Sequence, residues 1–306
     1  MTGIYEGRPL AIAITGASGM IGAALDRSLR AAGHRVVPVV RRPPRDGEVR
    51  WNPEAGRIDA PALEGIDVLV HLAGESIASG RWTRARMHRI RESRARGTAL
   101  IARTIAGLRR PPSAMISVSA VGIYGDRGDE TLTEHSPPGE GFLPEVAVIW
   151  EKAADPARDA GIRVVHPRLA AVLSASGGVV GRLLLPFRLG LGGPIGRGAQ
   201  WMPLVSLDDV VAVMRHLIDA PGLTGPVNVS LPTPVTNREF STALGRALRR
   251  PAIIPVPPAA LRAVYGQLAE ELLIASARVV PTALEASGYR FLHPTLDTAL
   301  AAALRS

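Results

Sequence analysis

Residues 11–22, AIAITGASGMIG, constrain the fold of this chain more than any other stretch. A short apolar run leads into glycines at positions 16, 19 and 22, and a helical pattern follows. Gly16 permits a tight turn, Gly19 lets a pyrophosphate approach the backbone, and Gly22 lets the helix pack closely on the sheet. The helix then offers unpaired N–H groups and its positive dipole end to the phosphates. This order predicts a dinucleotide-binding loop, with a structural glycine turn as the alternative. The predicted contacts come from Gly16, Ser18, Gly19, Met20, Ile21 and Gly22.

The second predicted strand, residues 35–40, refines the type of cofactor. In NAD-binding proteins a carboxylate near its end binds the ribose 2′-OH and repels a 2′-phosphate. Here Arg41 and Arg42 follow the strand, and the first acid is Asp46. Two guanidiniums, with the hydroxyl of Ser18, suit a 2′-phosphate, because arginine grips phosphate with two parallel hydrogen bonds. We therefore predict NADP(H) as the cofactor, and a solvated arginine pair is the alternative.

Composition excludes several kinds of site. The chain of 306 residues has no cysteine, so it has neither disulfides nor thiolate ligands. Its seven histidines show no H-x-x-x-H or H-E-x-x-H spacing, and we expect no metal site. The N-terminus lacks a basic segment followed by an apolar run, and no uncharged apolar stretch is long enough to span a bilayer. These features predict a cytoplasmic protein with no membrane partner.

The net charge of +9 raises the question of a nucleic-acid partner. Arginines concentrate between Arg81 and Arg110, but they are scattered around a predicted helix, residues 82–108, without interleaved aromatic residues. Lys152 is the only lysine, which indicates that arginine is used wherever a basic surface residue is needed. We predict a solvated helix face and no nucleic-acid binding, with an acidic partner as the alternative. Pairing of this helix with its twin in a homodimer stays open.

Strands and helices alternate along the first half of the chain. Apolar runs typical of buried strands occupy residues 11–15, 35–40, 68–72, 114–118 and 163–172. Helical patterns occupy residues 20–32, 82–108 and 142–160, the last with a break expected near Pro144. The predicted fold class is therefore α/β, a doubly wound parallel sheet of the Rossmann type with helices on both faces.

Three regions follow from this pattern. Residues 1–173 are predicted to form the NADP-binding Rossmann domain, to which strands and helices in 204–248 add. Residues 174–203, rich in glycine, are predicted to form a long ordered loop over the cleft. Residues 249–306 are predicted to form a smaller C-terminal helical region on the substrate side, near the carboxyl ends of the strands where open α/β sheets bind ligands.

Several short strings occur in order over nearly the whole chain. They are ITGASGMIG at 14–22, HLAGE at 71–75, RWT at 81–83, ESR at 92–94, SVSAVGIYGDRGDE at 117–130, PFRLGLGGP at 186–194, QWM at 200–202 and LDD at 207–209. With these strings the chain resembles the extended, atypical branch of the short-chain dehydrogenase/reductase superfamily. More narrowly, it resembles the NAD-dependent epimerase/dehydratase-like group, sugar-nucleotide epimerase-like, with a C-terminal domain of unknown function.

The resemblance implies roles for residues at two strand ends. Leu72, Ala73 and Gly74 are expected to let the backbone reach the adenine and ribose side of the cofactor. Val118 and Ser119 are expected at the sheet edge where the superfamily has its catalytic serine or threonine. For Ser119 the alternative is a serine that only forms a turn.

Further roles follow from the same resemblance. Pro167, Arg168 and Leu169 are expected to line the nicotinamide. An ion pair at the domain junction is the alternative role for Arg168. Glu75 and Trp201, which lie in two of the shared strings, are predicted substrate contacts.

One departure from the superfamily affects the chemistry. Ordinary members carry Tyr-x-x-x-Lys in the helix after the serine, with tyrosine as the acid/base. Here the residue that precedes Lys152 by that spacing is Val148, and the nearby pair is Trp150-Glu151. The usual proton relay is therefore absent.

Three explanations of this loss stay open. Tyr124, in a glycine-flanked loop five residues after Ser119, is the predicted replacement. Glu75, Glu134 or His135 is the alternative source of the proton. The third explanation is that the protein binds NADP(H) and catalyses nothing. We predict an NADP(H)-dependent oxidoreductase or epimerase acting on a carbon–oxygen centre of a small molecule, with a non-catalytic redox sensor or regulator as the alternative.

Overall fold

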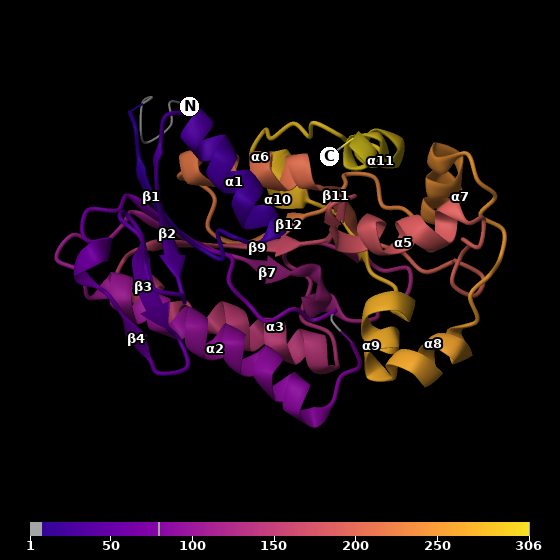
Figure 1. Ribbon diagram of the computed structural model, residues 1–306, viewed down its shortest axis with the longest axis horizontal. Helices are drawn as coiled ribbons and strands as arrows, with labels where there is room; N and C mark the ends of the chain where they lie inside the picture. Colours follow the sequence, from indigo (N-terminus) through magenta and orange to yellow (C-terminus); the bar gives the residue numbers. More distant parts are fainter. Residues whose placement is uncertain (1–7, 79, 306) are drawn as a thin grey trace.

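A mostly parallel sheet runs through the centre of the computed structural model, which describes residues 8–78 and 80–305 (Figure 1). In chain order its strands are β1 (Ala11–Thr15), β2 (Arg35–Val40), β3 (Val49–Asn52), β4 (Arg57–Ile58), β5 (Val68–His71), β6 (Ala114–Ser117), β7 (Ser119–Ala120), β9 (Arg163–Leu169) and β12 (Gly225–Val229). Across the sheet the order is β12-β9-β6-β5-β1-β2-β3-β4, with β7 beside β9. Every pair is parallel except β3 with β4. The predicted doubly wound α/β fold is confirmed.

The strands of the sheet centre are buried on both faces. Every residue of β1, β5 and β6 is buried, as their continuous apolar sequences predict. Residues of successive strands lie opposite one another in register: Thr15 pairs with His71, and His71 pairs with Ser117. The polar residues that end these strands therefore form one row at the carboxyl edge of the sheet.

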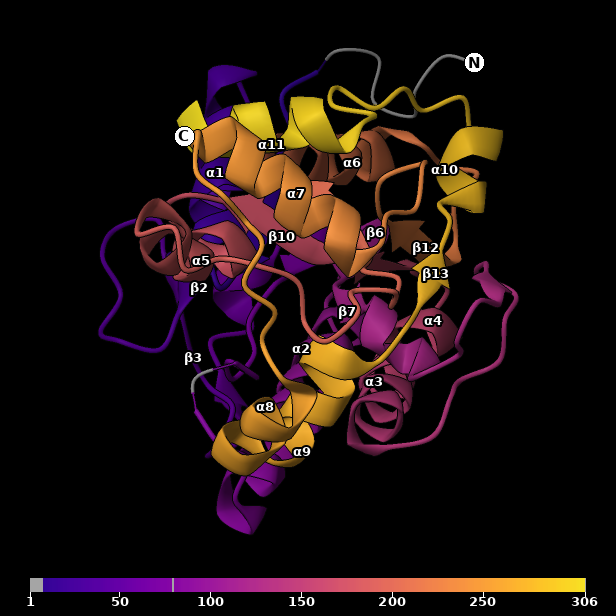
Figure 2. The same cartoon turned by 90° about the vertical axis from the view of Figure 1, so that its right-hand side faces the viewer.

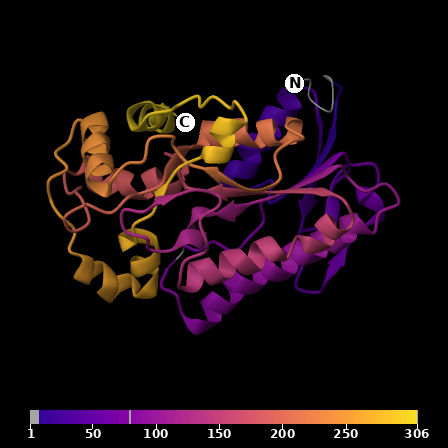
Figure 3. The same ribbon diagram turned by 180° about the vertical axis from the view of Figure 1, so that it is seen from behind.

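Helices cover both faces of the sheet (Figures 1 and 3). One face carries α2 (Arg84–Ala106), α3 (Phe142–Lys152) and α4 (Asp155–Asp159), and the other carries α1 (Met20–Ala31) and α6 (Leu207–Asp219). The alternation of side chains along β1 divides the core between them: Ala13 packs with Ile101 of α2, whereas Ile14 packs with Leu25 of α1.

The predicted helix over 142–160 is two helices, and the expected position of the break is wrong. Pro144 lies in the first turn of α3, where its missing N–H has no helical acceptor to lose. The chain leaves the helix at Ala153 and Ala154, and α4 begins at Asp155 with a proline in its first turn.

The predicted loop over 174–203 is also partly wrong, because α5 (Gly178–Arg188) occupies its centre. The helix forms despite Pro186 since Val180 and Phe187 are buried in a second, smaller core. That core joins α5 to α7 (Asn237–Leu248), α11 (Leu296–Arg305) and the short pair of β10 (Ala171–Ser174) and β11 (Leu204–Ser206).

The remaining elements belong mainly to the C-terminal region (Figure 2). They are α8 (Pro258–Tyr265), α9 (Gln267–Ala269), a single π-helical turn (Glu270–Ile274), β13 (Arg278–Val279), which pairs with β8 (Thr131–Leu132), and α10 (Thr282–Ala286). None of the helices that the structure describes combines the length and apolar character of a membrane span.

Asp209 joins the C-terminal segment to α6 through hydrogen bonds. Its carboxylate is fully buried in the first turn of α6 and accepts hydrogen bonds from Leu292 N at 2.7 Å, His293 N at 3.1 Å and Ser206 Oγ at 2.7 Å. One side chain thus satisfies the backbone of the segment that leads to α11.

We predict that Asp209→Ala lowers the free energy of unfolding by about 3 kcal/mol, because it leaves one buried donor, Ser206 Oγ, and two partly buried amides without their acceptor. Urea denaturation followed by circular dichroism measures the change. Asp208→Ala, at the exposed neighbouring position, is the control and should cost less than about 0.5 kcal/mol. Equal losses in the two variants would contradict the anchoring role of Asp209.

Candidate cofactor and active site

The glycine loop closes tightly between β1 and α1. Gly16 has φ +69°, and a Cβ there would lie 3.0 Å from backbone atoms of Leu72 and Ala73, so glycine is required where the loop meets the end of β5. A Cβ on Gly22 would lie 2.2 Å from the carbonyl oxygen of Gly16. Gly22 therefore permits close packing of α1 on the loop itself, rather than on the sheet as predicted.

The start of α1 is open to a ligand. Ser18 and Gly19 are exposed, and Gly19 precedes the first turn without a side-chain cap. The first amides of the helix, those of Met20, Ile21 and Gly22, have no acceptor within the helix. The structure thus brings all the predicted phosphate contacts into one turn, where an anion would be stabilised.

A threonine that the sequence reasoning missed holds the loop after β5. The Oγ1 atom of Thr15 accepts hydrogen bonds from Leu72 N at 3.1 Å and Ala73 N at 3.2 Å, and lies 2.7 Å from His71 Nδ1. Because Thr15 ends β1 and His71 ends β5, the strand pairing itself places these groups together. The pairing of the apolar strands β1 and β5 could be predicted from the sequence. The hydroxyl residue at the end of β1 was the signal that could have identified Thr15.

Two residues of the ESR string hold the same loop from α2. Ser93 Oγ accepts from Glu75 N at 3.1 Å, and Arg94 Nη1 donates to Glu75 O at 3.0 Å. The buried guanidinium of Arg94 also stacks on the ring of Trp150, 4.6 Å from its centre. Burial lowers the pKa of Arg94 to about 10, so it stays charged at neutral pH. The structure thereby joins two of the shared strings, HLAGE and ESR, and brings Trp150 of α3 against them.

The two arginines after β2 have different surroundings. Arg42 forms a two-pronged pair with Glu48, at 2.6 Å and 2.5 Å. Arg41 has no ion pair among residues 8–78 and 80–305 and borders a pocket of about 250 Å³. Trp51, Asn52, Pro53 and Glu54 line the rest of that pocket. Arg41 is therefore the more available cation at this edge.

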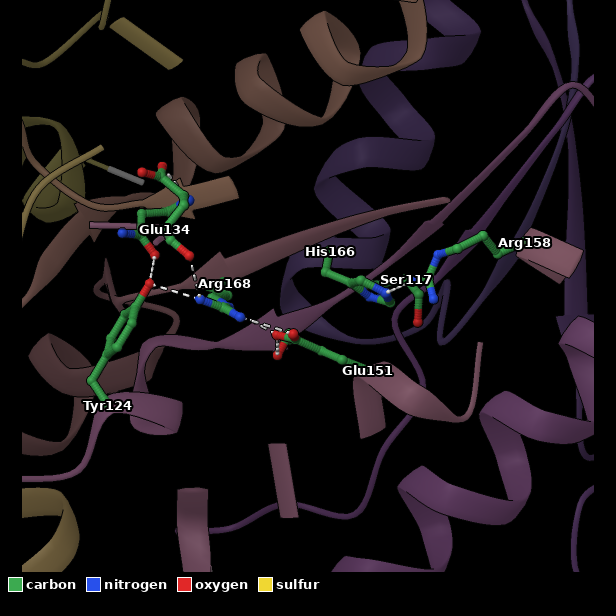
Figure 4. Close-up of polar contacts among 9 residues, drawn as sticks. Ser117, Tyr124, Glu134, Glu151, Arg158, His166 and Arg168 are labelled. Atoms are coloured by element: carbon green, nitrogen blue, oxygen red, sulfur yellow. Dashed lines mark hydrogen bonds and ion pairs between the residues drawn. The ribbon is translucent and has the colours of Figure 1, made fainter. Parts of the chain in front are cut away.

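An ion pair lies at the centre of the polar residues near the end of β9 (Figure 4). Arg168 Nε and Nη2 each donate to one oxygen of Glu151, both at 2.9 Å. Ser119 Oγ donates to Glu151 Oε1 at 2.7 Å. The parallel pairing of β7 with β9 sets Ser119 opposite Arg168, and the last turn of α3 brings the carboxylate to both.

Glu151 is a site residue that sequence reasoning missed. The motif spacing directs attention to Lys152, but Lys152 is exposed and the residue before it turns toward Ser119. Val148 and Ala147, one turn earlier, carry no ionisable group, and Ala147 is buried in the core. The available signal was the helical period of α3, which indicates which of its residues face β7.

The ionisation of this pair is fixed by its surroundings. Burial by itself raises the pKa of Glu151, but the hydrogen bonds and charge of Arg168 outweigh it, and the pKa lies below its usual range. Burial likewise lowers the pKa of Arg168, and Glu151 more than offsets this, so the pKa lies above its usual range. Both groups are charged at neutral pH.

Tyr124, the predicted replacement for the missing proton relay, lies in the core. It is fully buried; its hydroxyl donates to Asn228 Oδ1 at 2.7 Å and accepts from Arg168 Nη1 at 2.9 Å. Burial raises the pKa of this phenol above its usual value. The apolar sequence before Tyr124, in Val121–Tyr124, forms a buried turn and carries the ring inward.

The alternative proton donors lie in different places. Glu134 is buried and its Oε1 accepts from Asn228 N at 2.9 Å and Ala283 N at 3.1 Å, so its carboxylate has a structural task. His135 is exposed. Glu75 is half-buried, and its backbone is held by α2.

The other predicted contacts are distributed along the same edge. Val118 is buried, with its N–H bonded to His71 O at 3.1 Å; Pro167 and Leu169 flank Arg168 in β9. Trp201 has other partners: its Nε1 donates to Asp129 Oδ1 at 2.8 Å, and Arg278 stacks on its ring. No group of three or more residues suited to a metal ion occurs in the part of the chain that the structure describes.

The C-terminal region contacts the first turn of α3 through Glu271. Its carboxylate accepts from Phe142 N at 3.1 Å and Leu143 N at 2.7 Å. A carboxylate at the N-terminus of a helix accepts hydrogen bonds from the free N–H groups there and interacts favourably with the positive end of the helix dipole. The helix that carries Glu151 is thus capped from a segment far along the chain.

Comparisons with known proteins agree with this arrangement. A model described as the NAD dependent epimerase/dehydratase family matches residues 12–229, and a domain of unknown function, DUF1731, matches residues 256–303. The chain belongs to the NAD dependent epimerase/dehydratase family. Its relatives include epimerase family protein Mb2239 of Mycobacterium bovis, 43% identical over 94% of this chain and 96% of that protein.

Solved structures of family members resemble the whole chain. Human epimerase family protein SDR39U1 (isoform 2), solved with NADPH, is 36% identical, has a TM-score of 0.89, and matches 97% of this chain and 100% of that chain. A nucleoside-diphosphate sugar epimerase from Corynebacterium glutamicum is 37% identical with a TM-score of 0.82. The match covers 98% of this chain but 59% of that longer one.

We predict that Glu151→Ala lowers the free energy of unfolding by about 3–5 kcal/mol at pH 7, because it leaves the Arg168 charge buried and unpaired. Since the folded pKa of Glu151 is lowered, the contribution of the pair is present above the carboxyl's unfolded pKa. It is lost as pH falls through the folded pKa. Urea denaturation at several pH values measures both effects.

Two controls accompany this variant. Asp26→Ala breaks the exposed pair with Arg30 and should cost about 0–1 kcal/mol. Replacing both Glu151 and Arg168 by leucine should recover much of the loss, since no unpaired charge stays behind. A double variant less stable than Glu151→Ala would contradict the assigned cause.

Proposed function

We propose that the chain binds NADP(H) and moves hydride between the nicotinamide and a carbon–oxygen centre of a small molecule, as an oxidoreductase or an epimerase. The observation that carries the proposal is the glycine loop, in which Gly16 meets the end of β5 and the exposed Gly19 precedes the first turn of α1. The human relative solved with NADPH supports the same assignment. Oxidation, reduction and transient oxidation during epimerisation all use this hydride step.

The residues present fit a dinucleotide. The pyrophosphate would be held by Ser18, Gly19 and the first amides of α1, the ribose side by residues 72–74, and the nicotinamide side by residues 167–169. When bound, the cofactor supplies the hydride, and the residues of the chain hold and orient the reactants. Leu72 and Ala73 are suited to this task because Thr15 fixes their backbone.

Arg41 is the proposed contact for the 2′-phosphate. It borders the pocket beside β3, whereas the guanidinium of Arg42 is neutralised by Glu48. A phosphate in that position would gain charge-assisted hydrogen bonds from Arg41 without displacing an acid. Arg42 would contribute through its charge only after its pair with Glu48 opens.

Ser119 is the proposed contact for the reacting oxygen. A substrate hydroxyl that donates to Ser119 Oγ would pass its proton to the serine as the serine passes its own to Glu151. Glu151 is ionised and able to accept that proton, but its low pKa makes it a weak base. Tyr124, which contacts Arg168, would act by positioning this ion pair.

A second candidate function is an NADP(H)-binding regulator without catalysis. It is favoured by one observation: the hydroxyls of both Ser119 and Tyr124 are already engaged by protein groups. Incubation of the protein with NADPH and a set of aldehydes, ketones, quinones and nucleotide sugars tests both candidates. Single-turnover loss of NADPH absorbance that Ser119→Ala slows supports the enzyme. NADPH binding without any such loss across the set supports the regulator.

We predict that Arg41→Ala weakens NADPH binding by roughly ten- to a hundredfold and leaves NADH binding unchanged, since a charge-assisted contact contributes about 1.5–3 kcal/mol. Fluorescence titration of both cofactors measures this. Arg42→Ala is the matched control and should have a smaller effect because Glu48 already pairs with that residue. Equal affinities of the wild type for NADPH and NADH would refute the 2′-phosphate contact.

We predict that Gly19→Val abolishes NADPH binding while the protein stays folded. Gly19 has φ −75°, which valine tolerates, and its Cβ would come no nearer than 3.3 Å to Gly16 O. The side chain would occupy the space of the pyrophosphate. Gly222→Val, where a Cβ meets nothing within 4 Å, is the control. Undiminished NADPH affinity in a folded Gly19→Val protein would rule out the loop as the phosphate site.

A further inference from the structure

A buried polar layer lies between the sheet and α2, behind the loop that follows β5. Thr15, His71 and Ser117 end neighbouring strands on the face that carries α2, and all three are buried. From the covering helices, Thr98 of α2 and Trp150 of α3 point into the core. The function proposed above uses none of Ser117, Thr98 and the Trp150 indole N–H.

Four buried side-chain atoms of this layer have no hydrogen-bond partner among the described residues. They are His71 Nε2, Ser117 Oγ, Thr98 Oγ1 and Trp150 Nε1. A buried polar group without a partner is unfavourable, so four in one layer require an explanation.

Shared neighbours link these residues to one another in pairs. His71 and Ser117 are register partners on adjacent strands. The ring of Trp51 lies edge-on to His71, 6.0 Å between centres, and also approaches Gly97, the residue before Thr98. Arg94, one turn before Thr98, stacks on Trp150. The layer is thus continuous from β5 and β6 to both helices.

The hydrogen bonds of Thr15 fix the tautomer of His71. Thr15 Oγ1 already accepts from Leu72 N and Ala73 N, so its own proton is directed to the remaining neighbour, His71 Nδ1. Nδ1 is then an acceptor, and the proton of the neutral ring is on Nε2. Burial and the charge of Arg94 lower the pKa of His71 to about 4, so the ring is neutral at pH 7.

The layer therefore contains two N–H donors, from His71 and Trp150, that lack acceptors, together with two hydroxyls. We infer that ordered water occupies this layer, accepting from His71 Nε2–H and Trp150 Nε1–H and donating to Ser117 Oγ and Thr98 Oγ1. Water fits because it needs two to four polar partners that include both donors and acceptors. A halide ion would use only donors, and the nearby cation, Arg94, already donates Nη1 to Glu75 O and Ile90 O.

This water has a consequence for the loop after β5. By accepting from Nε2–H it stabilises the tautomer in which His71 Nδ1 receives the Thr15 proton, and Thr15 then keeps both lone pairs for Leu72 N and Ala73 N. The water would thus position the loop through His71 and Thr15. Only this last consequence rests on the proposed role of the loop in binding NADP(H).

Nitrogen-15 NMR of the cofactor-free protein at pH 7 tests the inference, together with a high-resolution crystal structure of it. We expect the Nε2–H tautomer for His71, a cross-peak between water and the Trp150 indole proton, and water density about 3 Å from both nitrogens. The Nδ1–H tautomer, or an empty layer, would overturn the proposal. So would bromide density in a bromide-soaked crystal.

Variants on α2 provide a matched comparison. Thr98→Val removes an acceptor of the proposed water and should weaken the water cross-peak of Trp150 severalfold. Thr104→Val, which removes a hydroxyl already bonded to Leu100 O, should leave it unchanged. Identical spectra of the two variants would overturn the assignment of Thr98. Because no cofactor is present, failure of NADPH binding leaves these outcomes unaffected, and the two proposals can fail separately.

Discussion

The pairing of Arg168 with Glu151 is the interaction on which the candidate site depends. It joins β9 to the end of α3, and through single hydrogen bonds it reaches Ser119 and Tyr124. A buried ion pair is expensive to form, so its value is more in fixing one geometry than in adding stability. Each of these residues has an assigned partner, and separating Arg168 from Glu151 would leave a buried charge unpaired.

The fold was largely predictable from the sequence, for a simple reason. Strands buried on both faces need uninterrupted apolar runs, and β1, β5 and β6 show them clearly. The errors fell where local signals conflicted with packing. Glycines and Pro186 predicted a loop at residues 178–188, but burial of Val180 and Phe187 stabilises a helix there. Tertiary contacts outweighed the weak local propensity.

The candidate site was less predictable than the fold. The glycine loop and the strand ends follow from spacing along the chain, because adjacent parallel strands end at one edge. Glu151 does not: its role depends on the rotation of α3 about its axis, which turns Lys152 outward. Tyr124 has the right chemistry and sequence position, but the apolar turn around it carries the phenol into the core. Contacts between distant segments decide both cases.

The cap that Glu271 places on α3 has a mechanical consequence. If the C-terminal region moved away from the sheet, the helix that carries Glu151 would lose its N-terminal cap. The hydrogen bond from Ala283 N to Glu134 Oε1 would also break. Such a hinge would therefore raise the energy of the site each time it opened.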